Sequence, residues 1–397
     1  MNKNNFKKEN LYDILIVGGG PAGSTAGYIL AKDGFNVILL DKNYFPRPKL
    51  CGGLLPYKTI ELLTRIYKES EESLIKNKTF NFISKTYKLY YKKKQILKNT
   101  TETPFYLVDR SIYDTFLLSK AKEAGVKIIQ GEKVEKVNEI LSEVTTLKGN
   151  KFRAKIIIGA DGVYSVVRKH IFSSHGDLDK WKTNLAETLQ IEIKRTKMFH
   201  DLKDISIYFN FINYGYCWIF PNKDKVIIGI GGLHTKNKKK IMHSFANFLS
   251  ILKINLKDIN NIKGYSIPFG NFLLKPAIGN IILLGDAAGF VNPLIGEGIF
   301  YAQRSAELAS LAIKKNFKKH LDVQNDYIKL INKDIILELQ YSTKLRNILF
   351  QKIKFVPVTI IKNLLNSKNH AFLELIQGRR SYASTAKKLS GKYKIKL

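Results

Sequence analysis

The 397-residue sequence predicts an α/β fold: a parallel-sheet domain that is interrupted by an antiparallel sheet and followed by a helical C-terminal region. Three observations favour this arrangement. Short apolar runs typical of buried parallel strands occur both early and late, at 12–17 and 281–284. Between residues 175 and 276, strand-like runs follow one another with few helices between them. From Ile299 onward the pattern is largely helical.

Length, composition and charge bound the class of protein. The chain is long enough for two joined domains with a well-buried core, and its 45% hydrophobic and 25% charged residues are close to globular averages. A net charge of +33 would suit a nucleic-acid partner. Lysine, however, is spread along the whole chain and far outnumbers arginine, so we expect no nucleic-acid partner. Solvated lysines are the main interpretation, and peripheral contact with an anionic membrane is the alternative.

The cysteines and the first residues indicate the compartment. Two cysteines, Cys51 and Cys217, do not make a disulfide framework, and a reducing cytosol is the simpler interpretation. Residues 1–10 are polar and lysine-rich, and no apolar run is long enough for a signal-peptide core or a membrane span. We therefore expect a cytoplasmic protein, with peripheral contact at the inner face of the membrane left open. No metal site is predicted.

A βαβ unit begins the chain, with a strand at 12–17, a helix at 21–32 and a second strand at 36–40. The intervening turn reads VGGGPAG. Its first glycine permits a tight turn, the next lets the backbone approach a pyrophosphate, and the last allows close packing against the helix, whose N-terminus attracts phosphate. The acid after the second strand has about the spacing of a ribose-binding carboxylate. We expect a Rossmann-type dinucleotide site formed by Gly18, Gly20, Pro21, Ala22, Gly23, Asp41 and Lys42.

The remaining elements divide the chain into three regions. Helices are predicted at 58–67, 111–123, 239–252 and 299–314. Strands are predicted at 87–91, 155–158, 185–193, 205–211, 216–220 and 226–230. We expect a discontinuous dinucleotide-binding domain (1–80, 105–174 and 277–320), a substrate-binding antiparallel-sheet domain (81–104 and 175–276) and a helical basic region (321–397).

Two later motifs decide the cofactor. The stretches IIIGADGVYSVVR at 156–168 and IILLGDAAGFVNPLIGEG at 281–298 resemble the GADG and GD motifs of the p-hydroxybenzoate hydroxylase-like flavoproteins. The resemblance implies FAD, with Asp286 accepting a hydrogen bond from a ribityl hydroxyl; a helix N-cap is its alternative role. The helix that follows presents its positive end to the flavin, which would stabilise the reduced anion. The residues implied are Asp161, Gly285, Asp286, Gly296, Gly298 and Ile299.

Arg110, in LVDRSIYD, matches the arginine with which these flavoproteins approach the cofactor. Its alternative is an ordinary surface salt bridge with Asp114, which follows at helical spacing.

Two further stretches, PRPKLCGG at 46–53 and YGYCWIFP at 214–221, together resemble the geranylgeranyl reductase family. The resemblance extends from about Tyr12 to Ala309 and becomes indistinct in the basic C-terminal region. It implies reduction of isolated carbon–carbon double bonds in a polyprenyl chain carried on a lipid, diphosphate, pigment or quinone. The electron donor stays open between NADPH and reduced ferredoxin, because the chain contains a single dinucleotide fingerprint.

Three residues are candidates for the chemistry. Protonation of an unactivated alkene develops cationic character, which the faces of Tyr216 and Trp218 could stabilise by about 0.5 to 2 kcal/mol. Their alternative role is to line an apolar tunnel. Cys51 precedes two glycines that bring the backbone close to the flavin, with Cys51 and Gly52 as cofactor contacts. We expect Cys51 to contact the substrate or relay a proton, its alternative being a small buried hydrophobe. Strand alternation points Cys217 away from this site.

Two other functions remain open. A flavin monooxygenase or halogenase shares the cofactor motifs, but Tyr216 and Phe220 depart from the halogenase WxWxIP box. A non-catalytic basic module that binds membrane or nucleic acid belongs to a different class and leaves the flavin motifs unexplained. The stretch 346–365 could lie on a membrane surface or form a helical lid over the substrate cavity.

Overall fold

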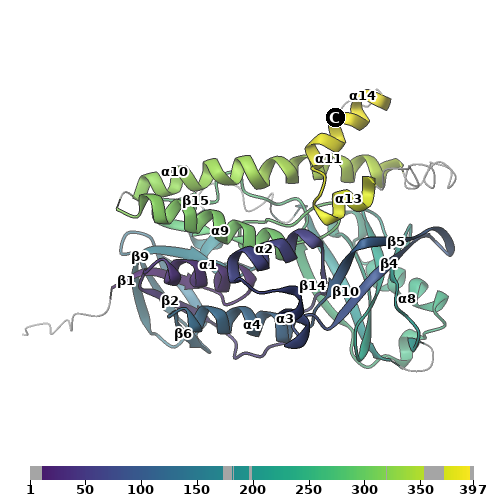
Figure 1. The fold of residues 1–397 in the computed structure, drawn as a ribbon, viewed down its shortest axis with the longest axis horizontal. Helices are drawn as coiled ribbons and strands as arrows, with labels where there is room; N and C mark the ends of the chain where they lie inside the picture. Colours follow the sequence, from purple (N-terminus) through teal and green to yellow (C-terminus); the bar gives the residue numbers. More distant parts are fainter. Residues whose placement is uncertain are drawn as a thin grey trace, which may run out of the picture.

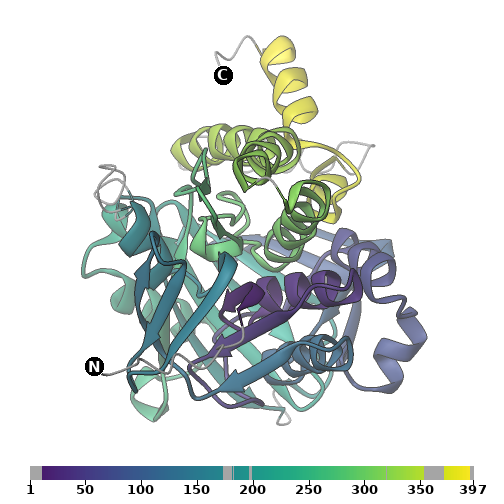
Figure 2. The same ribbon diagram turned by 90° about the vertical axis from the view of Figure 1, so that its left-hand side faces the viewer.

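The computed structural model describes residues 11–172, 181, 183–195, 199–318, 320–352 and 371–393. Two eight-stranded sheets lie beside each other, and the helices α9, α10 and α11 extend across them (Figure 1). Figure 2 shows these helices and the C-terminal segment grouped on one side of the sheets. The predicted mixed α/β fold is confirmed.

The first sheet contains the predicted parallel strands. Its main path runs β15-β16-β9-β1-β2-β6, and only β15 is antiparallel to its neighbour on this path. Val17, at the end of β1, lies opposite Leu40 on one side and Gly159 on the other, so the carboxyl ends of three strands meet at one edge. The strands are β1 (Tyr12–Val17), β2 (Val37–Asp41), β6 (Lys127–Gln130), β7 (Val134–Asn138), β8 (Glu143–Thr146), β9 (Lys151–Gly159), β15 (Ala277–Ile278) and β16 (Ile281–Leu283).

Helices pack on this sheet because small residues let them approach closely. Where α1 and α9 cross, Gly285 has a φ of 53°, and a Cβ there would lie 3.0 Å from the Cβ of Ala302 and 3.3 Å from that of Ala22. The fully buried Ile14, Leu15 and Ile16 contribute to the core beneath. The helices around the sheet are α1 (Pro21–Lys32), α2 (Tyr57–Tyr67), α3 (Glu71–Lys76), α4 (Arg110–Glu123), α5 (Val166–Phe172), η4 (Gly285–Ala287) and α9 (Ile299–Asn316).

The second sheet has the order β14-β10-β13-β12-β11-β4-β5-β3. The sequence predicts an antiparallel sheet, and every neighbouring pair is antiparallel except β11 and β4, which are parallel. Periodicity within a strand cannot reveal which distant strand it joins, and the sequence patterns predict neither β3 nor β14. The strands are β3 (Leu54–Leu55), β4 (Phe82–Tyr91), β5 (Lys94–Leu107), β10 (Leu185–Lys194), β11 (Ile205–Phe209), β12 (Gly215–Pro221), β13 (Lys225–Leu233) and β14 (Lys263–Pro268).

The two faces of the second sheet pack against different partners. On one face Cys217 and Ile228 pack with Phe245 and Phe248 of the helix α8. The other face carries the Trp218 side chain and faces the C-terminal helices. The helices attached to this sheet are α7 (His234–Asn237), α8 (Ile241–Ile251) and η3 (Leu256–Asp258).

The described part of the C-terminal region is helical, as predicted. A π-helical turn joins α10 to α11, and α13 packs back towards α2 through a hydrogen bond from the Tyr57 amide to Gln377 Oε1 of 2.7 Å. Residues 353–365 of the predicted amphipathic stretch lie outside the described residues. No helix in the described ranges is both long and apolar enough to cross a membrane. The helices are α10 (His320–Ile331), η5 (Asn332–Ile336), α11 (Leu337–Lys352), α13 (Ala371–Gln377) and α14 (Tyr382–Tyr393).

Candidate active site

A single cavity of about 890 Å³ extends from the glycine turn of the first sheet to the face of the second sheet and the C-terminal helices. Its volume lies in the upper part of the range for small-molecule pockets. Gly23 and Gly285 are the two predicted site residues that do not line it; both lie behind it in helix packing. The predicted residues that line it are Gly18, Gly20, Pro21, Ala22, Asp41, Lys42, Cys51, Gly52, Arg110, Asp161, Tyr216, Trp218, Asp286, Gly296, Gly298 and Ile299.

The glycine turn is fixed by its own backbone and by Asp41. Gly18 has a φ of 106°, and a Cβ on Gly23 would lie 1.9 Å from the Gly18 carbonyl oxygen, so both positions require glycine. Asp41 Oδ2 accepts a hydrogen bond from the Gly19 amide at 2.7 Å, while Oδ1 accepts one from the Asn43 amide at 2.8 Å. The predicted ribose carboxylate therefore also orders the turn.

The space above this turn fits a diphosphate. No side chain caps the N-terminus of α1, so its amides are available to an anion. A Cβ placed on Gly20 would have a single neighbour, the Arg47 guanidinium at 3.6 Å. The glycine turn, the amides at the helix N-terminus and the Arg47 cation together suit the binding of a dinucleotide pyrophosphate.

The Arg110 guanidinium lies at the cavity wall and is also paired with Asp114. It lines the cavity, and it forms a paired hydrogen bond with Asp114, at 2.7 Å from Nε to Oδ1 and 2.9 Å from Nη2 to Oδ2. The pair is buried and not on the surface, because Asp114 is fully buried. Arg47 lies 3.2 Å from the same carboxylate, so one acid holds two cations at the cavity wall.

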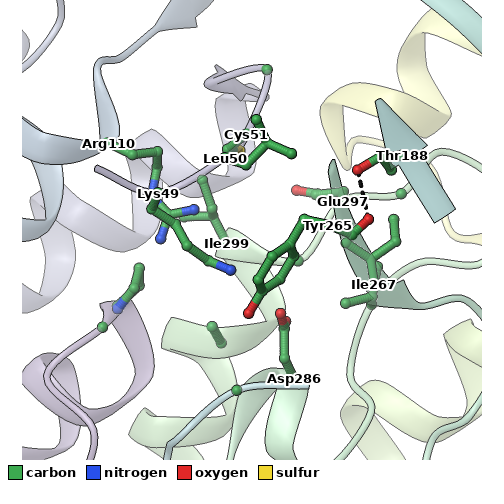
Figure 3. A pocket seen from close by; sticks show the side chains of 18 of the residues that line it. Lys49, Leu50, Cys51, Arg110, Thr188, Tyr265, Ile267, Asp286, Glu297 and Ile299 are labelled. Carbon is green, nitrogen blue, oxygen red and sulfur yellow. Dashed lines mark hydrogen bonds between the residues drawn. The ribbon is translucent and has the colours of Figure 1, made fainter. Parts of the chain in front are cut away.

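Lys49, Tyr265 and Asp286 point toward one another in the middle of the cavity (Figure 3). The Lys49 ammonium lies 3.2 Å from the centroid of the Tyr265 ring. Burial lowers the pKa of Lys49 to about 8, although the negative charge of Asp286 opposes this shift. Burial raises the pKa of Asp286, and Lys49 and Arg110 oppose that shift. The Asp286 carboxylate accepts no hydrogen bond from the described part of the chain, which leaves it available to a ligand hydroxyl.

Arg168 joins the GADG motif to the GD motif, and Asp161 orders the GADG loop itself. Asp161 Oδ2 accepts a hydrogen bond from the Val166 amide at 2.7 Å at the start of α5, and within the described ranges its buried Oδ1 has no hydrogen-bond partner. Arg168 donates to the Ala287 carbonyl at 2.9 Å, and its guanidinium lies 3.5 Å from the centroid of the Trp181 ring. The GADG loop is thereby tied to the GD loop.

The CGG segment packs directly against the aromatic side chains of β12. A Cβ on Gly52 would lie 2.7 Å from the Phe220 ring and 3.5 Å from Trp218 Nε1. Gly53 has a φ of 74°, and its amide donates a hydrogen bond to Cys51 Sγ at 3.4 Å. The two glycines therefore place the half-buried Cys51 at the cavity wall, next to the aromatic face of the sheet.

The aromatic side chains of β12 form one wall of the cavity. Tyr216 donates a hydrogen bond to the Ile295 carbonyl at 2.5 Å. The Trp218 ring lies on Gly229 of the neighbouring strand, where a Cβ would come within 2.2 Å of the ring. The indole Nε1 is buried and has no hydrogen-bond partner in the described part of the chain. Cys217 is buried on the opposite face, as predicted.

Beyond Trp218 the cavity is lined by hydrocarbon side chains. They come from the interior strands β4 and β11 of the second sheet and from α11 and α13, which are distant in sequence. These residues are Leu89, Ile207, Phe209, Phe350, Leu373 and Ile376.

Sequence reasoning missed several charged and polar residues of the cavity. Arg47 and Lys49 belong to the PRPKLCGG motif, and Glu297 belongs to GEG, yet the motifs alone assign none of them a role. Tyr265 carries no sequence signal, because β14 brings it into the site by pairing with β10. In the described ranges, no three His, Cys, Asp or Glu side chains are grouped so as to hold a metal ion.

Comparison with known proteins agrees with this geometry. A family model described as an FAD binding domain matches residues 11–310. A geranylgeranyl diphosphate reductase of Rhodobacter capsulatus is 30% identical over 77% of this chain and 77% of its own length. The chain belongs to the geranylgeranyl reductase family of FAD-binding proteins. It is an FAD-dependent oxidoreductase.

Two further relatives support the assignment. A digeranylgeranylglycerophospholipid reductase of Methanococcus vannielii is 29% identical over 90% of this chain and 92% of its own length. The crystal structure of a geranylgeranyl bacteriochlorophyll reductase-like protein of Thermoplasma acidophilum superposes with a TM-score of 0.72, covering 96% of this chain and 99% of that one at 20% identity. At that identity the superposition demonstrates a shared fold.

Proposed function

We propose that the protein is an FAD-dependent reductase that saturates isolated C=C bonds of a polyprenyl chain carried on a lipid, diphosphate, pigment or quinone. The observation that carries the proposal is the continuity of one cavity, polar at the glycine turn and apolar beyond Trp218. A dinucleotide cofactor and a hydrocarbon chain require these two environments side by side. The names of the relatives from Rhodobacter capsulatus and Methanococcus vannielii support this substrate class.

The residues of the polar end fit FAD. The glycine turn and Arg47 would hold the pyrophosphate, Asp41 the ribose, and Asp286 a ribityl hydroxyl. When bound, reduced FAD supplies the hydride. The Arg110–Asp114 pair fixes the position of a cation at the cavity wall before any ligand arrives, which avoids the entropy cost of ordering it afterwards.

The aromatic wall and Cys51 would act on the alkene. Charge that develops on a substituted carbon during protonation is stabilised by the faces of Tyr216 and Trp218, and apolar neighbours exclude water that would otherwise trap it. Cys51 lies beside both Arg110 and the aromatic wall, where a thiol can contact the substrate or relay a proton. Cys51→Ser separates these roles from simple packing: unchanged alkene reduction with retained FAD would remove Cys51 from the mechanism.

The partners outside the cavity belong to the same proposal. Either NADPH or reduced ferredoxin serves as electron donor. The excess of lysine favours peripheral contact with anionic lipid at the inner face of the membrane, where a prenylated substrate resides. Flotation with liposomes should increase with the anionic lipid fraction; flotation that ignores lipid charge would contradict the electrostatic contact.

The decisive experiment is anaerobic incubation of the reduced enzyme with a panel of prenyl diphosphates, prenylated pigments, quinones and ether lipids. Mass spectrometry should show the gain of one pair of hydrogen atoms for each bond reduced, in at least one member of the panel. A flavin monooxygenase or halogenase would leave the whole panel unchanged in this anaerobic incubation. In air, it would instead consume oxygen in the presence of its substrate.

A further inference from the structure

A buried ion pair joins α2 to the loop that precedes α9. Lys58 Nζ lies 2.6 Å from Glu297 Oε2, and the two side chains are 11% and 7% exposed. Removing two charges from water costs more than a mutual attraction commonly returns, so a buried pair is a weak means of stabilising a fold. Its position suggests another use.

Glu297 lies at the cavity wall, between Gly296 and Gly298 and directly before the first turn of α9. Its second carboxylate oxygen, Oε1, is buried and has no hydrogen-bond partner among the residues that the structure describes. The Glu297 carboxylate therefore lies at the N-terminus of α9, where the helix dipole presents positive potential to a ligand in the cavity.

Neighbouring side chains hold the Lys58 ammonium beside the Glu297 carboxylate. Its ammonium lies 4.4 Å from the Phe300 ring centroid and 4.7 Å from that of Tyr301. On the other side the turn after α13 closes over its alkyl chain, since a Cβ on Gly378 would lie 2.6 Å from Lys58 Cδ. The ammonium and the carboxylate thus form a neutral unit at the loop.

We propose that the balance between the two charges of the Lys58–Glu297 pair holds the reduction potential of the bound FAD at its value, so that loss of either charge alone shifts it. Two electrons and one proton convert FAD to its anionic reduced form, which carries one more negative charge than the oxidised form. The carboxylate of Glu297 opposes that charge and the ammonium of Lys58 favours it, so the neutral pair leaves the N-terminus of α9 free to stabilise the reduced anion. Lys58 and Glu297 are positioning residues in this account, since they act through charge.

This inference rests on the FAD site alone and is independent of the substrate. It is tested by measuring the midpoint potential of the FAD-loaded protein in an anaerobic dye-coupled titration with no prenyl compound present. The variants are Glu297→Gln, Lys58→Met and the double variant, each scored for FAD content by absorbance before titration.

Glu297→Gln should raise the potential, because the Lys58 ammonium is then unopposed. A tenfold change in the reduction equilibrium, about 30 mV for a two-electron couple, is the expected size. Lys58→Met should lower the potential by a similar amount at alkaline pH, where the carboxylate stays ionised. The double variant should return to the wild-type value, and it keeps the test usable if Lys58→Met alone does not fold.

The chain offers a control in a second ion pair, which joins α2 to α9 itself. Arg65 of α2 donates to Glu307 of α9, with a distance of 3.0 Å from Nη2 to Oε2, and neither residue lines the cavity. Arg65→Met and Glu307→Gln should leave the potential unchanged. The proposal is overturned if Glu297→Gln and Lys58→Met shift the potential in the same direction, or if neither shift exceeds that of the control variants.

Discussion

The two ends of the cavity are built in different ways. The polar end is made of loops at the carboxyl ends of parallel strands, where Gly18, Asp161 and Asp286 each follow a strand directly or nearly so. The apolar end is made of side chains on a sheet face and on helices, such as Ile207 and Phe350. Loops that hold a cofactor need particular residues at particular positions, whereas a hydrocarbon wall needs only volume and low polarity. Short sequence motifs therefore identify the cofactor site, whereas no short motif specifies the hydrocarbon wall that would hold the substrate.

The two tryptophans of the chain mark this contrast, because one lies at each end. Trp181 packs under the Arg168 guanidinium behind the GADG loop, and Trp218 lies on Gly229 in the aromatic wall. Substitutions at the polar end should abolish cofactor binding, and substitutions at the apolar end should leave the cofactor bound.

The largest expected effect comes from Gly23→Val. The new Cβ would occupy space 1.9 Å from the Gly18 carbonyl oxygen, so the turn must open and the protein should lose its FAD on purification. Absorbance of the purified flavin measures this. Gly27→Ala in the same helix is the control, since its Cβ would have no neighbour closer than 3.3 Å. Full FAD content in Gly23→Val would show that the polar end tolerates sequence change as well as the apolar end does.

The next effect concerns the charge buried in the polar end. Because the pKa of Lys49 is lowered from 10.5 to about 8, the unfolded chain binds more protons than the folded one between these values. The free energy of unfolding of the FAD-free protein should therefore rise with pH in this window, by up to about 3 kcal/mol. Urea unfolding at pH 7.5, 9 and 10.5 would measure it. The rise should disappear in Lys49→Met; an equal rise in that variant would assign it to other groups.

A smaller effect is expected at the aromatic wall. Trp218→Leu should lower turnover about 2- to 30-fold, the range that a cation–π contribution of 0.5 to 2 kcal/mol predicts, with FAD content unchanged. Single-turnover alkene reduction and flavin absorbance measure the two quantities. Trp181→Leu should show the reverse pattern, with reduced FAD retention. Equal turnover in Trp218→Leu would leave the indole as a tunnel lining.

The polar end of the cavity can be predicted from the sequence because the residues of each part of it lie close together in the chain. The role of each part can be recognised from a few neighbouring residues. These parts are the turn from Gly18 to Gly23, the acid Asp41 and the GD motif. The positions of Tyr265 and Lys58 depend on contacts between distant elements, which a single strand or helix pattern does not record. Arg110 shows the intermediate case: its spacing to Asp114 is visible in the sequence, but only the fold shows that their ion pair is buried at a cavity wall.

The two sheets take their strands alternately along the chain, as the pairing of β4 with the distant β11 illustrates. This alternation restricts how the protein can be divided into modules. The first sheet takes its strands from 12–41, 127–159 and 277–283, and the second from 54–55, 82–107 and 185–268. Any single cut within residues 56–262 divides the strands of both sheets between the two halves, so neither half contains a complete sheet. Exchange of substrate specificity between relatives by recombining contiguous halves should therefore fail, and heat should unfold both sheets in one calorimetric transition.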